Sequence, residues 1–323
     1  MTWRAGQASV AVVPGMSHDE IVKVLPAQLR AVHQEIENQE HGKELQWAVR
    51  RDRCFLVFDI VSSAESRHRI PFVSYGVSPS VAFVNHIKRI IHLPGLRGNP
   101  RRTYPKTAGG PEFQGTLEPY IASVIAQWQG NNNQKHLDDL AQCLEHLGLT
   151  WKVKAEPVDD TQVELKVGRL PHSRRGAAHD LVSIADVGFG VSQSLPVVVA
   201  LLAAQAGQLV YLEQPEIHLH PLAQRRLASV LKGAVERGVI AVVETHSALL
   251  LREVQTLIDT GHFRKEDVVL HWLERDQEGA TTVRTARPDD NGAYGEWPED
   301  FDKTELEAEK AYLDAVEGKE AGK

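Results

Sequence analysis

The hydrophobic pattern is clearest between residues 181 and 250, where apolar runs alternate with an amphipathic segment. Residues 209–212 (LVYL) and 239–245 (VIAVVET) are short apolar runs typical of buried strands. Between them, residues 221–238 place apolar side chains on one helical face, begin with a proline and end with a glycine. A strand, a helix and a second strand in this order predict a β-α-β unit with parallel strands.

Weaker patterns precede this unit. Residues 1–50 are polar and mostly helical in pattern, with residues 24–39 as the best case, whereas residues 55–61 and 70–77 predict strands. Residues 80–105 begin like a helix or a strand and end in a Gly/Pro-rich basic loop.

Further along, helices are predicted from Leu117 to Leu149, and residues 161–167 alternate like a half-buried strand. Residues 267–276 and 280–287 predict a hairpin, which a charged C-terminal helix follows. The chain is therefore predicted to be an α/β protein.

Composition limits the function only loosely. A net charge of −7 means that nucleic-acid binding would need a local basic patch. Cys54 and Cys143 are too far apart for a disulfide framework or a metal-ligand pair, which suits a reducing cytoplasm. The N-terminus is a poor signal peptide, and polar residues interrupt the longest apolar stretch, residues 195–212. We therefore expect a soluble, cytoplasmic protein without a membrane span.

A glycine-rich motif, GFGVSQ, precedes the β-α-β unit. Gly188 and Gly190 permit a tight turn with close backbone approach. Ser192 and Gln193 then open a long apolar helix, whose free N–H groups and dipole favour an anion. The alternative is that the glycines serve only packing.

Polar side chains follow both strands of the unit. Glu213 and Gln214 end the first, and Glu244 and His246 end the second. Ligands gather at the carboxyl ends of parallel strands. A carboxylate there can hold Mg²⁺ through water beside phosphate oxygens, and a neighbouring polar group can orient an attacking water. The alternatives are a solvated strand end and a capping histidine.

Three ordered motifs, GFGVSQ, LVYLEQPEIHLHP and VVETHS, resemble those of the ABC-type ATPases. The resemblance is to the AAA-like branch, which includes relatives of SMC proteins and OLD-like ATPases of bacterial phage defence. It extends over roughly residues 80 to 310. It implies a P-loop NTPase sheet with a helical insertion, and an ATPase that uses ATP and Mg²⁺.

The resemblance also assigns roles. Glu213 takes the place of the Walker B carboxylate that holds Mg²⁺ through water. Gln214 stands where many relatives have a catalytic glutamate, and it can orient water but cannot accept a proton. Glu216 is the candidate to accept that proton, and His246 matches the switch histidine that senses the γ-phosphate.

The glycine-rich motif corresponds to the family's signature, which contacts ATP bound by the opposite subunit. The resemblance therefore implies a head-to-tail homodimer or a partner ATPase or effector subunit. His218 is expected to pack or cap, and His220 takes the place of an aspartate that faces the other subunit. The signature residues are Gly188, Gly190, Ser192 and Gln193.

One element of the family is missing. A Walker A loop has the form G-x-x-x-x-G-K-[ST], and Gly-Lys occurs here only at residues 42–43, 318–319 and 322–323, with no Ser or Thr after it. We therefore expect the N-terminal phosphate-loop part of the fold to be missing, through truncation, splitting or degeneration. The chain alone should bind ATP poorly.

On this interpretation the chain has four parts. They are a remnant of the N-terminal ATPase lobe (1–85), a basic loop with a helical insertion (86–180), the signature, Walker B and switch core (181–260), and a closing hairpin with a C-terminal helix (261–323).

A metal-dependent hydrolase is one alternative. His218, His220 and His246 would bind zinc, with Glu244 or Glu216 as the base.

A DNA-binding scaffold without ATPase activity is another alternative. Its phosphate contacts would come from a basic cluster with an interleaved aromatic ring, made of Arg97, Arg101, Arg102, Lys106 and Tyr104.

Overall fold

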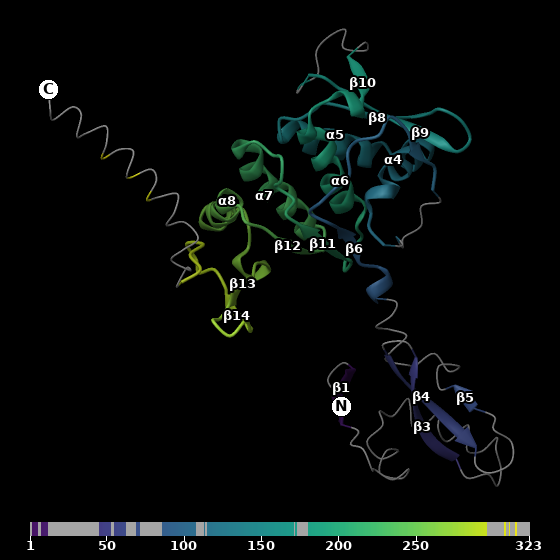
Figure 1. Cartoon of the computed structure of the whole chain (residues 1–323). Coiled ribbons are helices and arrows are strands. Elements are labelled where there is room, and N and C mark those ends of the chain that lie inside the picture. Colours follow the sequence, from purple (N-terminus) through teal and green to yellow (C-terminus); the bar gives the residue numbers. More distant parts are fainter. Residues whose placement is uncertain are drawn as a thin grey trace. The chain divides into compact units, whose positions relative to one another are not determined.

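The computed structural model describes residues 86–107, 113, 115–170, 172 and 180–295 with their side chains, and residues 307, 310 and 314 farther on. Of residues 1–85 it describes the backbones of five strands. The chain divides into two units, residues 1–88 and 89–323 (Figure 1).

The N-terminal unit contains two small antiparallel sheets. Strands β1 (Thr2–Ala5) and β2 (Ala8–Ala11) form one, and β3 (Leu45–Asp52), β4 (Phe55–Ser62) and β5 (Arg69–Pro71) form the other in that order. Strands β4 and β5 confirm the strand predicted at 55–61 and the beginning of the one predicted at 70–77. The remainder of the latter lies outside the described residues.

The prediction that residues 1–50 are mostly helical is wrong for the parts described. Strands occupy residues 2–5 and 8–11, and the next described strand begins at Leu45. In β3, Leu45, Trp47 and Val49 alternate with other residues, which is the period of a strand. The candidate helix at 24–39 lies outside the described residues.

The core of the larger unit is a parallel sheet of order β12-β11-β6. Its strands are β6 (Ile91–Leu93), β11 (Leu209–Glu213) and β12 (Ile240–Glu244). Helix α7 (Pro221–Glu236) connects β11 to β12, which confirms the predicted β-α-β unit. In the segment left open between helix and strand, residues 86–88 are helical and strand β6 follows them, so both elements occur there.

Two central helices cover one face of this sheet. In α6 (Phe189–Ala203), every residue from Ser192 to Leu202 is buried, so the helix lies inside the protein. Helix α7 is amphipathic and buries one stripe only. It begins with Pro221 after His220 and ends before Gly238, whose φ of +85° suits a glycine. The buried residues of α7 are Ala223, Leu227, Ala228, Val230, Leu231 and Ala234.

The segment predicted as a helical insertion contains more than helices. The turn η2 (Glu118–Tyr120) leads into α4 (Ile121–Gly130) and α5 (Gln134–His146), as predicted. An antiparallel sheet packs beside them, in which β9 pairs with each of the other three strands. The strands are β7 (Tyr104–Pro105), β8 (Val153–Pro157), β9 (Gln162–Gly168) and β10 (Leu181–Ser183).

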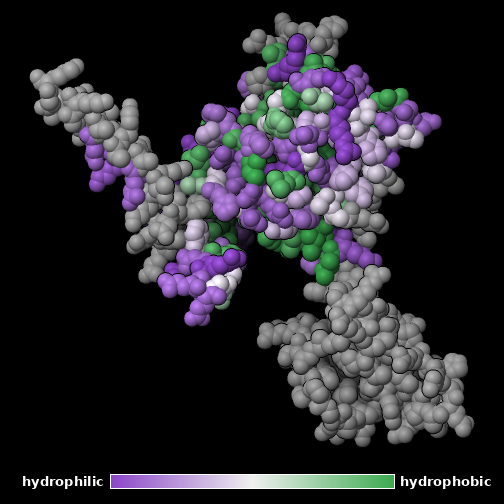
Figure 2. Space-filling view, viewed as in Figure 1, coloured by the Kyte–Doolittle hydropathy of each residue, from purple (hydrophilic) through white to green (hydrophobic). Residues whose placement is uncertain are grey.

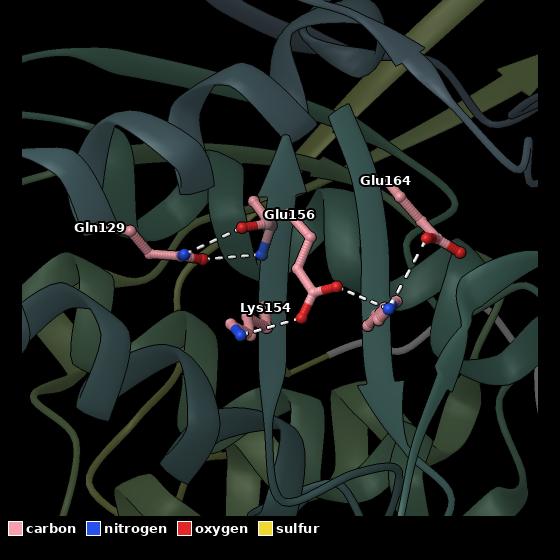
Figure 3. A network of polar contacts seen from close by, with 6 residues as sticks. Gln129, Lys154, Glu156 and Glu164 are labelled. Carbon is pink, nitrogen blue, oxygen red and sulfur yellow. Dashed lines mark hydrogen bonds and ion pairs between the residues drawn. The ribbon is translucent and has the colours of Figure 1, made fainter. Parts of the chain in front are cut away.

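Polar contacts fix helix α4 to this sheet (Figure 3). The Gln129 side chain accepts from the Ala155 N–H at 2.7 Å and donates to the Ala155 carbonyl at 3.0 Å. On the strands, Glu156 binds Lys154 at 2.8 Å and Lys166 at 2.5 Å. These charges form a ladder across β8 and β9.

The chain then leads through η4 (Ile184–Asp186) to α6, and after β12 through α8 (Ala248–Asp259) and η5 (Lys265–Asp267). Strands β13 (Leu270–Arg275) and β14 (Thr281–Ala286) form the predicted hairpin. Of the predicted C-terminal helix only residues 307, 310 and 314 are described, and each is helical. Among the described residues, no helix has the length and apolar character to cross a membrane.

The other face of the parallel sheet is left open by the described residues. Val210 and Leu212 of β11 are fully buried beneath the helices, whereas Leu209 on the opposite face is only half-buried. On β12, the strand at the edge of the described sheet, Ile240 is 49% exposed and Val242 is 45% exposed. Figure 2 shows apolar surface at the lower edge of the larger unit, where Figure 1 draws the sheet. Parallel sheets are usually covered on both faces.

Candidate functional site

The two strand-end carboxylates lie next to each other. Glu213 and Glu244 are direct partners in the register of β11 and β12. The Gln214 N–H donates to the Glu244 carbonyl at 2.8 Å, so the pairing continues one residue beyond β11. The sequence prediction that both acidic strand ends meet at one edge of the sheet is confirmed.

Glu213 is held at two points. One carboxylate oxygen lies 2.9 Å from His92 Nε2, and the other accepts from the Gly95 N–H at 3.1 Å. Hydrogen bonding to His92, and then to Gly95, lowers the pKa of Glu213. The carboxylate is therefore kept charged and oriented, as a metal-associated carboxylate requires.

Gln214 lies at a strained turn. Its φ is +42°, in the left-handed region that non-glycine residues seldom adopt. Its carbonyl accepts from Arg97 Nη2 at 3.0 Å, and its side chain lies close to Gly95. Strain at such a position costs about 1–3 kcal/mol and is concentrated at functional sites. Gln214 stands beside Glu213, where it can orient a polar ligand.

Glu216 is not presented to the open end of the sheet. Its side chain is buried, and one oxygen accepts from the His246 N–H at 2.9 Å. The second oxygen is buried too, and no described residue binds it. We had expected Glu216 to accept a proton from water. Its geometry instead suits holding the backbone of His246, whose own side chain is exposed.

The two polar side chains of the signature motif, Ser192 and Gln193, are not presented to solvent. Ser192 bonds the Phe189 carbonyl and Gln193 bonds the Gly98 carbonyl, so both side chains are turned inward. Gly188 is exposed at the helix start, and no side chain caps that end of α6. The groups available to an anion are therefore the free N–H groups at the helix start.

Gly190 has a packing reason to be glycine. A Cβ at this position would lie 3.4 Å from Leu149 Cδ2 and 3.7 Å from the His218 carbonyl oxygen. The signature loop thus approaches the turn that follows β11. The packing interpretation is confirmed for Gly190, whereas Gly188 has open space around it and its anion-binding role stays a prediction.

The three histidines of the metal-hydrolase alternative serve other purposes. His220 caps α7 by accepting from the Leu222 N–H, and the His218 ring lies 5.7 Å from the ring of Phe189. Among the side chains that the structure describes, no three His, Cys, Asp or Glu residues are placed to hold a metal ion. The zinc cluster of His218, His220 and His246, which this alternative requires, is therefore not formed by these described side chains.

The basic cluster is also not one exposed patch. Arg97 is half-buried and points toward the Gln214 carbonyl, and burial lowers its pKa. Arg102 makes a two-point ion pair with Asp186, at 2.7 and 3.1 Å. Arg101 and Lys106 are exposed, while Tyr104 is half-buried and its hydroxyl accepts from the Arg101 N–H. The expected joint grip on DNA phosphates has little geometric support.

Sequence reasoning missed His92, Gly95 and Tyr211. His92 interrupts the apolar run of β6, and a lone polar residue inside such a run is the signal that was available. Gly95 acts through its backbone N–H, which leaves no trace in a residue pattern. His92 and Gly95 belong to the site because β6 pairs with β11 in parallel.

The chain has a mixed α/β fold with a parallel sheet and the fold class of P-loop ATPases of the AAA type. A family model described as "AAA domain, putative AbiEii toxin, Type IV TA system" matches residues 64–252, more than half of the chain. The chain belongs to this family. ATPases of this kind generally use a nucleotide and Mg²⁺.

Similar solved structures are SMC ATPase heads, at low similarity. One, from work on "ATP-driven dimerization and DNA stimulated activation of SMC ATPases", is 11% identical, with a TM-score of 0.37, covering 49% of this chain and 88% of that chain. An SMC head bound to the C-terminal winged-helix domain of ScpA is 11% identical, with a TM-score of 0.35; coverage is 52% of this chain and 48% of that one.

The SMC head domain from Thermotoga maritima is 8% identical, with a TM-score of 0.33, covering 75% of this chain and 74% of that chain. No curated protein matches the chain significantly. Membership of the family therefore rests on the family model.

Proposed function

We propose that the carboxyl end of the β6-β11-β12 sheet is one part of an ABC-type ATP site. The observation that carries the proposal is the gathering of Glu213, Gln214 and the start of the segment at His246 at one end of two paired strands. Metal-bound phosphate is the ligand that this combination of carboxylate, amide and imidazole suits.

Each residue has a task in this proposal. Glu213, held in its charged form, would bind Mg²⁺ through water, and Mg²⁺ would neutralise charge on the phosphates. Gln214 would orient the attacking water without accepting its proton, so hydrolysis should be slow. The exposed imidazole of His246 would contact the γ-phosphate. Glu216 would hold His246 in place through its backbone N–H.

The phosphate loop has to come from elsewhere, because the sequence contains no G-x-x-x-x-G-K-[ST]. A phosphate loop is part of a strand–loop–helix element. The open edge of β12, with Ile240 and Val242 half exposed, offers backbone pairing and apolar surface to such a strand. We infer that a strand with its phosphate loop pairs with β12 and completes the site.

The uncapped start of α6 supports a second contact. Its free N–H groups would reach ATP held by the opposite subunit, which makes the active species a head-to-tail dimer of this chain or a pair with a partner subunit. The family description names a toxin of a toxin–antitoxin system. We infer a role in phage defence, with ATP-dependent assembly controlling an effector, from the resemblance of the three motifs to those of OLD-like ATPases.

Titration of the purified chain with a fluorescent ATP analogue and Mg²⁺ tests the proposal. We expect weak binding, with a dissociation constant on the order of 1 mM, because most phosphate contacts are missing. Glu213→Gln should weaken it about tenfold, while Glu236→Gln, at the far end of α7, should change nothing. ATP turnover of about 1 s⁻¹ or faster by the chain alone would refute the composite site.

Phage plating on cells that express the chain tests the defence role. Protection should be lost with Glu213→Gln and retained with Glu236→Gln. Equal protection by wild type and Glu213→Gln would contradict a role for this carboxylate in defence.

A further inference from the structure

Two stacked ring side chains each contact one of the strand-end carboxylates. His92 of β6 and Tyr211 of β11 are direct partners in the parallel register, and their rings stack with centroids 5.1 Å apart and planes 16° apart. Each ring reaches one carboxylate. His92 Nε2 lies 2.9 Å from Glu213, and the Tyr211 hydroxyl donates to Glu244 at 3.2 Å.

We propose that His92 is the positioning residue for Glu213, and that stacking on Tyr211 fixes the His92 ring in the orientation that this task requires. The proposal rests on the proposed function only for the importance of Glu213. The hydrogen bond between His92 and Glu213 and the stacking of His92 on Tyr211 are present in the chain without nucleotide.

The physical need for such a hold follows from the register. Glu213 and Glu244 are adjacent on parallel strands, so two like charges face each other across the sheet. Unsupported carboxylates would turn away from each other into solvent. His92 donates a hydrogen bond to Glu213, and Tyr211 donates one to Glu244, so each carboxylate is stabilised by its own donor. Hydrogen bonds to charged groups are also stronger than neutral ones.

The ring nitrogen assignments follow. Since Glu213 is charged and can only accept, the proton of a neutral His92 must be on Nε2. Stacking restrains the ring plane, and the Gly95 N–H restrains the other oxygen of Glu213. Removal of the His92 donor should therefore also loosen the hydrogen bond between Gly95 and Glu213.

A matched pair of variants separates the donor from the packing. His92→Gln retains an N–H donor, whereas His92→Phe retains a ring that can stack on Tyr211 but has no donor. We expect the Gly95 amide to exchange with deuterium about tenfold faster in His92→Phe, and near the wild-type rate in His92→Gln. Equal rates in wild type and His92→Phe would overturn the proposal, as would fast exchange in both variants.

Nitrogen-15 spectra of the wild-type ring give a test that needs no variant. They should show the neutral form of His92 protonated on Nε2, and protonation on Nδ1 would overturn the proposal. Neither measurement uses nucleotide. If the Gly95 amide exchanges faster only when the His92 donor is removed, but the chain does not bind ATP, the proposed function alone is refuted. If the chain binds ATP, but the exchange rate of the Gly95 amide does not depend on the His92 donor, the positioning role alone is refuted.

Discussion

The buried carboxylate of Glu216 accepts a hydrogen bond from the backbone N–H of His246, at 2.9 Å. This bond links the turn after β11 to the end of β12, across 30 residues of sequence. Arg97 adds an attractive charge from the β6 side, so three strand ends meet around Glu216.

Replacement of Glu216 should therefore destabilise the fold. We expect Glu216→Ala to lower the free energy of unfolding by about 1–3 kcal/mol, because the His246 N–H loses its buried acceptor and Arg97 loses an attractive charge. Glu216→Gln retains an acceptor for His246 and should cost less. Urea denaturation checks both, and an unchanged midpoint for Glu216→Ala would contradict the structural role.

A second prediction concerns the packing of the parallel sheet against the helices. Leu212 is fully buried on β11, whereas Leu222 at the start of α7 is 48% exposed. Leu212→Ala should cost about 2–5 kcal/mol through the cavity that it leaves. Leu222→Ala should stay within about 0.5 kcal/mol of wild type. Similar unfolding midpoints for the two variants would contradict the described core.

Alanine substitutions at two glycines would distinguish the cost of steric overlap from the cost of backbone strain. Gly292 and Gly261 have φ values of +75° and +71°. A Cβ at Gly292 would overlap the Gln255 carbonyl oxygen, whereas one at Gly261 would meet nothing within 4 Å. Alanine at Gly261 should cost about 1–2 kcal/mol, which is the strain alone.

Alanine at Gly292 should cost clearly more, because the backbone of α8 would have to move. Thermal unfolding of the two variants measures the difference. Equal melting temperatures would show that the close approach to Gln255 is absent in solution.

Asp180 should make stability depend on pH in the acid range. The Leu170 N–H, with further bonds from Trp151 and Arg169, lowers the pKa of this carboxyl below its usual 3.8. A carboxyl with a lowered pKa in the folded state stabilises the fold above its unfolded pKa, and this contribution is lost as the pH falls through the folded value.

Wild type should therefore lose its advantage over Asp180→Asn as the pH falls from about 5 to about 2. Unfolding measured across this range checks the sign. A gap between the two proteins that widens toward acid pH would contradict the assignment.

Local patterns predicted the elements of the core because their periodicities are complete within short segments. Strand β11, helix α7 and strand β12 each carry their own apolar run, and Pro221 and Gly238 mark the ends of the helix. In contrast, β6 has three residues, too few for a period to show. The helical expectation for residues 1–50 failed at β3, where large apolar residues recur with a period of two only over Leu45, Trp47 and Val49.

The sequence predicted only those site residues that come directly after a strand in the chain. Glu213, Gln214 and His246 are visible in this way. His92 lies 121 residues from Glu213, and Arg97 lies 117 residues from Gln214. These contacts depend on the pairing of β6 with β11, which no local pattern specifies. The inward orientation of Ser192 and Gln193 likewise follows from the burial of α6.

The uncovered edge of β12 also affects how the chain behaves before it meets any partner. A strand edge with free backbone groups and the half-exposed side chains of Ile240 and Val242 is a template for pairing with another copy of itself. A chain in which nothing covers this edge of the described sheet would therefore be prone to aggregate. Synthesis together with the segment that pairs with β12 would protect the chain from aggregation. The amount of soluble chain in the cell would then depend on the ratio of the chain to that segment.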